Sequence, residues 1–219
     1  VVYITKWPQQ QLRFCMQMPG IFQYDEKQDC DELFKYANLF DTATGTDLAL
    51  NVLKFVAECL TNVRKELKSY IERLESNSFD FSRIKKHIEL REILSETVPN
   101  PSKETILKMM VWFSENKDFK AYRAELLSEM IRSVKYAIDH DLSICDASNH
   151  IRKDAELQKR YTGFKFLSSR TLLSKGLEFD CVIIDMTTPL SAKDFYVAMT
   201  RAMRKIYIIS NTNVFSFQE

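Results

Sequence analysis

Two apolar runs near the end of the sequence, separated by a segment with helical character, constrain the fold more than any other feature. Residues 179–186 (FDCVIIDM) are apolar almost without interruption, and residues 205–210 (KIYIIS) form a second run. Such runs are typical of strands buried on both faces, as in a parallel sheet covered by helices. Ser191 and Asp194 have the spacing of a helix-capping box, so we expect a helix from there to about residue 204. The sequence therefore predicts a β-α-β unit.

Most of the chain before residue 160 has the periodicity of amphipathic helices. Between residues 47 and 74, apolar residues recur at spacings of three and four, which predicts one long helix with a single buried face. Asn100 and Pro101 have the residue types of an N-cap and a first helical position. Further helices are expected over residues 29–40, 81–94, 118–138 and 146–161. This part of the chain is expected to form a helical bundle.

The two ends of the chain carry the remaining strand signals. Residues 1–5 (VVYIT) are β-branched and aromatic, which predicts a short strand, and Phe164, Phe166 and Leu167 suggest another. Residues 9–28 have no clear period and are expected to be irregular. We therefore predict three parts: a lead-in over residues 1–28 whose strand could join the sheet, a helical subdomain over 29–161 and an α/β segment over 162–219.

Composition narrows the class of protein. The 219 residues are 45% hydrophobic and carry a formal net charge of +1, as in ordinary globular proteins. This balance excludes a strongly basic protein that coats nucleic acid, but it leaves room for a local basic patch. No apolar run approaches the roughly 18 residues of a membrane span, and no signal peptide is visible. We expect no membrane partner and a cytoplasmic location.

Metal and disulfide sites are not expected. The five cysteines are scattered and include no CxxC pair, which suits a reducing compartment. His87, His140 and His150 are isolated from one another and from any acidic cluster, so they do not suggest a metal site.

Charged residues flank both strands of the predicted β-α-β unit. Lys175 and Glu178 precede the first strand, and Arg201 and Arg204 are expected at the end of the helix. Loops at strand ends line ligand crevices in α/β sheets, and the planar guanidinium suits phosphate. The charges alone leave a structural alternative, in which Lys175 and Arg204 are solvated and Arg201 pairs with Asp194 or Glu178.

Two strings in this stretch are more specific than its charges. The first is KGLEFDCVII, over residues 175–184, and the second is FYVAMTRAMRKIYII, over residues 195–209. In this order they resemble motifs V and VI of superfamily 1 helicases of the UvrD/Rep/PcrA type, over about residues 170–211. The resemblance implies α/β architecture: the C-terminal part of a RecA-like parallel sheet of the P-loop NTPase kind. The helical residues are compatible with the large α-helical subdomain that this family inserts in its second RecA-like domain.

The resemblance implies an ATP-binding role for three residues. Arg201 matches the motif VI arginine that reaches the γ-phosphate as an arginine finger, and it is the implied catalytic residue. Glu178 matches the motif V glutamate near the ribose. Gly176 lies in the loop between the nucleotide cleft and the bound single strand.

The resemblance also implies residues that contact nucleic acid or couple it to the nucleotide. Thr171 and Lys175 belong to the motif V loop, and Tyr196 and Thr200 shape motif VI. The implied partner is single-stranded DNA, along which the family moves from 3′ to 5′. This sequence departs from the family in the string RTLLS before Lys175, where a His is usual.

The implied enzyme is an ATP-dependent DNA helicase with ATP and Mg²⁺ as cofactors. The chain contains neither a GxxxxGK[ST] string nor an acidic DExx string, so the phosphate cradle and the magnesium ligands are not in it. We expect them in a first RecA-like domain preceding Val1 in the intact protein, and we expect this chain alone to hydrolyse no ATP. The alternative is a non-catalytic, helicase-like module that binds nucleic acid or protein.

Overall fold

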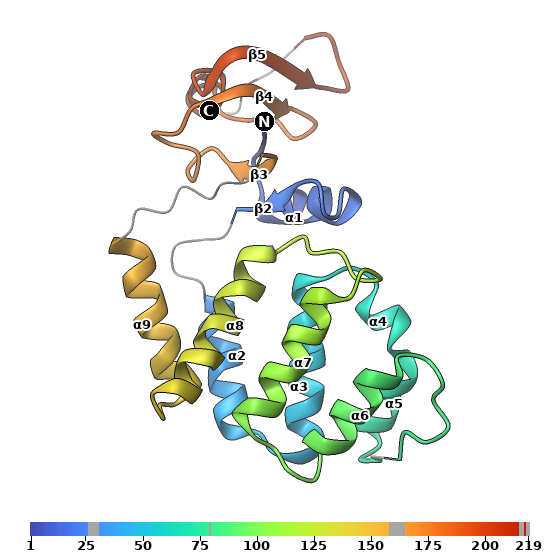
Figure 1. Cartoon of the computed structure of the whole chain (residues 1–219). Helices are drawn as coiled ribbons and strands as arrows, with labels where there is room; N and C mark the ends of the chain where they lie inside the picture. Colours follow the sequence, from blue (N-terminus) through green and yellow to red (C-terminus); the bar gives the residue numbers. More distant parts are fainter. Residues whose placement is uncertain (26–30, 79, 158–164, 215–216, 218–219) are drawn as a thin grey trace. The chain divides into compact units, whose positions relative to one another are not determined.

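The computed structural model describes residues 1–25, 31–78, 80–157, 165–214 and 217 (Figure 1). The chain divides into two compact units. One unit combines Val1–Lys27 with Thr162–Glu219, and the other is Gln28–Tyr161. The first unit is therefore built from both ends of the sequence.

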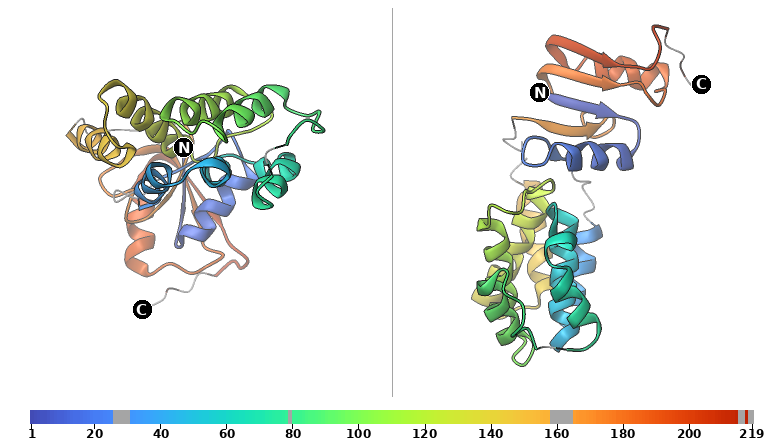
Figure 2. Two further views of the ribbon diagram at one scale, coloured as in Figure 1. Left: turned by 90° about the horizontal axis from the view of Figure 1, so that it is seen from below. Right: turned by 90° about the vertical axis from the view of Figure 1, so that its right-hand side faces the viewer.

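The first unit contains a five-stranded parallel sheet with the order β2-β3-β1-β4-β5 (Figure 2). Its strands are β1 (Val2–Thr5), β2 (Gln23–Tyr24), β3 (Leu167–Arg170), β4 (Phe179–Asp185) and β5 (Ala202–Ile209). Val2 pairs with Leu167 on one side and with Val182 on the other. The predicted N-terminal strand is confirmed, and it occupies the centre of the sheet.

Helices α1 (Pro8–Gln17) and α10 (Ala192–Met199) lie on opposite faces of this sheet. The ring of Tyr3 stacks on Phe14 of α1, with centroids 3.7 Å apart. Val2 and Ile4 belong instead to the apolar cluster that contains Ala198 of α10. Successive residues of a strand point to opposite faces, so α1 covers the face of Tyr3 and α10 the other. This is the layering of an α/β fold and is consistent with a RecA-like sheet.

Helix α1 corrects the prediction of an irregular segment over residues 9–28. Pro8 occupies the first turn, and the buried face of α1 consists of Gln11 and Cys15. The Gln11 amide Nε2 donates to the carbonyl oxygens of Asp25 and Ser168, at 2.9 and 2.7 Å. The helix is anchored by a buried glutamine, which a search for apolar residues does not register.

The second unit consists of helices around one apolar core. They are α2 (Asp31–Thr42), α3 (Gly45–Cys59), α4 (Val63–Glu66), α5 (Lys68–Glu75), α6 (Ile88–Thr97), α7 (Lys103–Glu115), α8 (Ala124–Asp139) and α9 (Ile144–Leu157). Rings of Tyr36, Phe40 and Phe55 meet edge to face or tilted within that core. No helix in the described part of the chain is long and apolar enough to cross a membrane.

The single helix predicted over residues 47–74 is wrong, because the chain forms α3, α4 and α5 instead. Asn62 adopts the left-handed region, with φ of 64°. The carbonyl oxygen of Cys59 accepts from the backbone N–H groups of Tyr122 and Arg123, at 3.0 and 3.2 Å. A bridge between Leu60 and Ala121 continues this pairing. Tertiary backbone bonds therefore break a pattern that would favour one helix.

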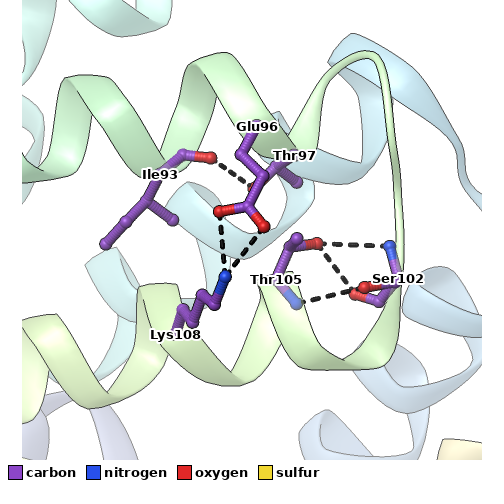
Figure 3. A network of polar contacts seen from close by, with 6 residues as sticks. All are labelled: Ile93, Glu96, Thr97, Ser102, Thr105 and Lys108. Atoms are coloured by element: carbon purple, nitrogen blue, oxygen red, sulfur yellow. Dashed lines mark hydrogen bonds and ion pairs between the residues drawn. The ribbon is translucent and has the colours of Figure 1, made fainter.

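Helix α7 begins two residues later than predicted, and its cap is visible in Figure 3. The Ser102 hydroxyl oxygen accepts from the Thr105 backbone N–H at 3.3 Å, and the Thr105 hydroxyl oxygen accepts from the Ser102 N–H at 3.2 Å. The Asn100 N–H is already bonded to the Glu96 carbonyl, 3.1 Å away, in the turn that follows α6. The reciprocal Ser102–Thr105 cap therefore replaces the predicted Asn100–Pro101 start.

Other predicted bounds also shift. Helix α6 starts at Ile88 rather than near residue 81, and α8 starts at Ala124 rather than residue 118. Helix α10 ends at Met199 rather than near residue 204, so Arg204 lies in β5. The predictions for Phe164 and residues 158–161 fall outside the described residues.

Strand β5 differs from the prediction in its burial. It was expected to be buried on both faces, but it lies at the edge of the sheet and its residues are exposed from Met203 to Ile209. The apolar character of a sequence run alone does not distinguish a central strand from an edge strand.

Candidate functional site

The backbone of Arg201 is fixed between α10 and the start of β4. The Ser191 hydroxyl caps α10 by accepting from the Asp194 N–H at 3.1 Å. The helix ends at Met199, and the Arg201 N–H donates to the Ala198 carbonyl at 3.2 Å. The Arg201 carbonyl oxygen accepts from the Phe179 N–H at 2.8 Å. The start of β4 and the residue that precedes β5 are therefore in direct contact.

The Arg201 side chain is held by neutral acceptors. Nε donates to the Val197 carbonyl at 3.2 Å, Nη1 to the Leu177 carbonyl at 3.1 Å and Nη2 to the Thr200 hydroxyl at 3.1 Å. These bonds use three of the five N–H groups of a guanidinium, so two N–H groups have no acceptor among the described residues and are available to a ligand.

Within the described residues Arg201 forms no ion pair, so the structural alternative for this residue is wrong. The Asp194 carboxylate accepts instead from the Ser191 hydroxyl at 2.8 Å, and Glu178 is exposed. Arg204 provides the contrast, because its Nε pairs with the Asp180 carboxylate at 3.2 Å. No carboxylate among the described residues of this unit therefore balances the charge of Arg201.

The loop between β3 and β4 combines a buried beginning with an exposed end. Thr171 and Ser174 are buried, and the Ser174 hydroxyl donates to the Thr171 carbonyl at 3.1 Å. Lys175, Gly176 and Glu178 are exposed. Gly176 has φ of +80°, and a Cβ added there would meet nothing within 4 Å. The glycine is therefore required by backbone conformation and not by a close neighbour.

The predicted site residues lie at opposite ends of the strands of the sheet. Lys175, Gly176 and Glu178 precede β4, and Thr200 and Arg201 precede β5, so these lie at the amino ends of the strands. Tyr196, in the last turn of α10, is on the same side, and its ring is 66% exposed. Thr171 follows β3 and lies at the carboxyl end. The structure brings the first group together and separates Thr171 from it.

Sequence reasoning missed a polar cluster at the carboxyl ends of β1 and β4. The Tyr3 hydroxyl donates to the buried Asp185 carboxylate, and the Thr187 N–H and hydroxyl donate to the same carboxylate at 2.9 and 2.6 Å. Burial, followed by the neighbouring Asp185, raises the pKa of Tyr3. Tyr3 therefore stays protonated and serves as a donor.

The cluster continues from Asp185 to α1. The Gln10 amide Nε2 donates to the Thr188 hydroxyl at 2.6 Å, and the Thr5 hydroxyl donates to the Gln10 Oε1 atom at 2.8 Å. Connections leave β1 and β4 toward opposite edges of the sheet here, a position at which open α/β sheets bind ligands. Polar residues directly after each apolar strand were the available signal. The sequence predicts no helix or strand over residues 9–28, so it does not bring Gln10 to this cluster.

Asp25 occupies the carboxyl end of β2. Burial raises the pKa of its carboxyl group, and the hydrogen bond from the Ser169 hydroxyl and the charge of Arg170 partly oppose that shift. No group of three or more His, Cys, Asp or Glu residues is placed to hold a metal in the ranges that the structure describes.

Comparison with protein families identifies the stretch that contains Arg201. The family model of the UvrD-like helicase C-terminal domain matches residues 173–209. This stretch is similar to the C-terminal domain of UvrD-like helicases. The match covers the end of the β3–β4 loop, β4, α10 and β5, and it confirms the UvrD type of the resemblance seen in the sequence. No curated protein matches the chain.

Proposed function

We propose that this chain supplies the C-terminal RecA-like part of an ATP-dependent DNA helicase or translocase. One observation carries the proposal: the segment similar to the UvrD-like helicase C-terminal domain holds Arg201 against Leu177 with two guanidinium N–H groups unused. The match to the UvrD-like helicase C-terminal domain over residues 173–209 supports the helicase class. The roles of single residues are our proposal.

The environment of Arg201 fits a phosphate. Its charge has no carboxylate partner in the described residues, and its remaining donors can form a charge-assisted fork. In this role Arg201 stabilises the negative charge that develops on a transferred phosphoryl group. Gly176 and Glu178, whose loop meets Arg201 through Leu177, are the proposed contacts to the rest of the nucleotide.

ATP with Mg²⁺ supplies the phosphoryl group and the metal charge in such enzymes. This sequence has no GxxxxGK[ST] string, so the phosphate cradle is assigned to an N-terminal RecA-like domain of the same protein. Catalysis is then shared between two domains, and the 219-residue chain alone hydrolyses no ATP.

Single-stranded DNA is the proposed second ligand, with movement from 3′ to 5′. Exposed Lys175 suits a backbone phosphate, and the exposed ring of Tyr196 can stack on a base. Thr200 positions Arg201 by accepting from Nη2 at 3.1 Å. Thr171, buried at the other end of the loop, is proposed to couple the loop to β3.

A non-catalytic, helicase-like binding module is the second candidate. The observation that favours it is Leu172, which is 66% exposed in the loop where the sequence has no His before Lys175. This module would bind a single strand without ATP turnover.

The rate of ATP hydrolysis by the intact protein, with and without single-stranded DNA, distinguishes the two candidates. The enzyme predicts hydrolysis that the single strand stimulates, and no hydrolysis by the 219-residue chain alone. Strand binding without turnover by the intact protein would establish the binding module. If the isolated chain hydrolysed ATP and its Arg201→Ala variant did not, this result would contradict an ATP site shared between two domains.

A further inference from the structure

The connection from β4 to α10, residues 186–191, begins at a buried carboxylate. Asp185, the last residue of β4, accepts from the Tyr3 hydroxyl and from the N–H and hydroxyl of Thr187. Hydrogen bonds to a charged acceptor are stronger than those between neutral groups. The first residues of the connection are therefore held against β1 through Tyr3.

The next residues of the connection are held by side chains from β1, α1 and the turn between them. The Gln10 amide Nε2 donates to the Thr188 hydroxyl at 2.6 Å, and the Lys6 Nζ donates to the Pro189 carbonyl oxygen at 3.3 Å. The Thr5 hydroxyl orients Gln10 by donating to its Oε1 atom at 2.8 Å. The connection is thus bonded at successive residues to the N-terminal segment of the chain.

Helix α10 runs from this connection to Arg201. Leu190 and Ala198, just before the helix and near its end, are buried in the same apolar cluster. The Val197 carbonyl and the Thr200 hydroxyl accept from the Arg201 guanidinium at 3.2 and 3.1 Å. Because α10 has eight residues and is only about 12 Å long, a shift at its start moves its end as well. Two of the acceptors that hold Arg201 therefore depend on where α10 begins.

The composition of this cluster favours orientation over simple packing. Removing a carboxylate from water costs free energy, so apolar side chains would fill the end of a strand more favourably than Asp185. Hydrogen bonds are directional, and a buried network of them specifies one geometry. The cluster therefore fixes the direction in which the chain enters α10.

We propose that Tyr3 and Gln10 are positioning residues for Arg201. Tyr3 fixes the start of the connection through Asp185, and Gln10 fixes Thr188, so that α10 delivers the guanidinium at one position and one angle. A misplacement of about 1 Å in a reacting group can cost about 10²-fold in rate. This inference rests on the proposed phosphate contact of Arg201, and it adds the residues that set its geometry.

Tyr3→Phe in the intact protein tests the first residue. It removes the hydroxyl and keeps the ring that stacks on Phe14. We expect kcat for ATP hydrolysis to fall about 10-fold with the KM for ATP unchanged, because Arg201 acts on the transition state. The matched control is Ser169→Ala, which also removes a hydroxyl that donates to a carboxylate, that of Asp25, but lies in β3, away from α10. The control should retain its rate, and an unchanged kcat in Tyr3→Phe would overturn the proposal.

Two substitutions of Thr188 test the contact with Gln10. Thr188→Val keeps the shape of the side chain but removes the acceptor of the Gln10 amide, whereas Thr188→Ser keeps the hydroxyl. We expect kcat to fall about 10-fold in the first variant and by less than about 2-fold in the second. Equal rates in the two variants would contradict the role of Gln10. Circular dichroism verifies that each variant is folded.

A double-mutant cycle separates positioning from a general loss of stability. In an Arg201→Lys background, Tyr3→Phe should change kcat by less than about 2-fold, because the group that it positions is already absent. Effects of the two substitutions that multiply would overturn the proposal and leave the proposed function intact. A wild-type rate in Arg201→Lys alone would instead contradict the proposed function, and this inference with it.

Discussion

The Nη1 atom of Arg201 donates to the carbonyl oxygen of Leu177, 3.1 Å away. These residues are 24 positions apart, one before β5 and the other before β4. Their contact holds together the two strings that lie within the segment matched by the helicase family model. The geometry of the proposed phosphate contact therefore depends on the conformation of the β3–β4 loop, which contains Leu177, as well as on Arg201.

We expect Gly176→Ala to lower the free energy of unfolding by about 1 kcal/mol, because the left-handed region is unfavourable for a residue with Cβ. The open space around the site means that strain, and not a clash, is the cause. Urea denaturation measures the loss. Gly176→Asn should be milder, since asparagine tolerates this region. A stability of Gly176→Ala equal to that of the wild type would contradict the φ of +80°.

The cap of α7 predicts a second stability effect (Figure 3). Ser102→Ala removes the acceptor of the Thr105 N–H and should cost about 1 kcal/mol. Lys108→Ala removes an exposed ion pair to Glu96, 2.8 Å long, and should cost less than about 1 kcal/mol. Thermal and urea unfolding compare the two variants. A larger loss for Lys108→Ala than for Ser102→Ala would contradict the cap.

Asp25 predicts a pH dependence of stability. Burial raises the pKa of its carboxyl group in the folded state, so the folded chain holds this proton more tightly than the unfolded chain. Between the unfolded value, about 3.9, and the raised folded value, the contribution of Asp25 to the free energy of unfolding falls as pH rises. Asp25→Asn cannot titrate, so the wild type should lose stability relative to the variant across this window.

Unfolding in urea at a series of pH values measures that difference. Ser169→Ala provides the control: it removes the hydrogen bond that lowers the pKa of Asp25, so the pH dependence should extend to higher pH. A wild type that gains stability relative to Asp25→Asn as pH rises would contradict the assigned shift.

Prediction from sequence succeeded where one local pattern determines the structure. The apolar run of β4 and the Ser191 cap of α10 were both predicted. It failed where backbone groups distant in sequence determine the structure, as at Cys59. The Cys59 carbonyl accepts a hydrogen bond from the Tyr122 N–H, and the helix ends there although the apolar periodicity continues. It also failed at α1, whose buried glutamine Gln11 bonds to strands that are remote in sequence.

The candidate site was predictable only in part for a related reason. The strings around Lys175 and Arg201 identified the residues, but not their acceptors, because carbonyl groups such as that of Leu177 leave no signature in the sequence. The exposure of β5 was not predictable either, since an apolar run is the same in the centre and at the edge of a sheet.

The most direct test of the central claim is the Arg201→Lys variant of the intact protein. Its steady-state rate of ATP hydrolysis is measured in the presence of single-stranded DNA and compared with that of the wild type. Lysine keeps the charge but lacks the planar fork, so kcat should fall by about 10³-fold or more. Arg204→Lys, three residues further along and paired with Asp180, is the matched control and should retain its rate. An Arg201→Lys rate equal to that of the wild type would contradict the proposed role of Arg201.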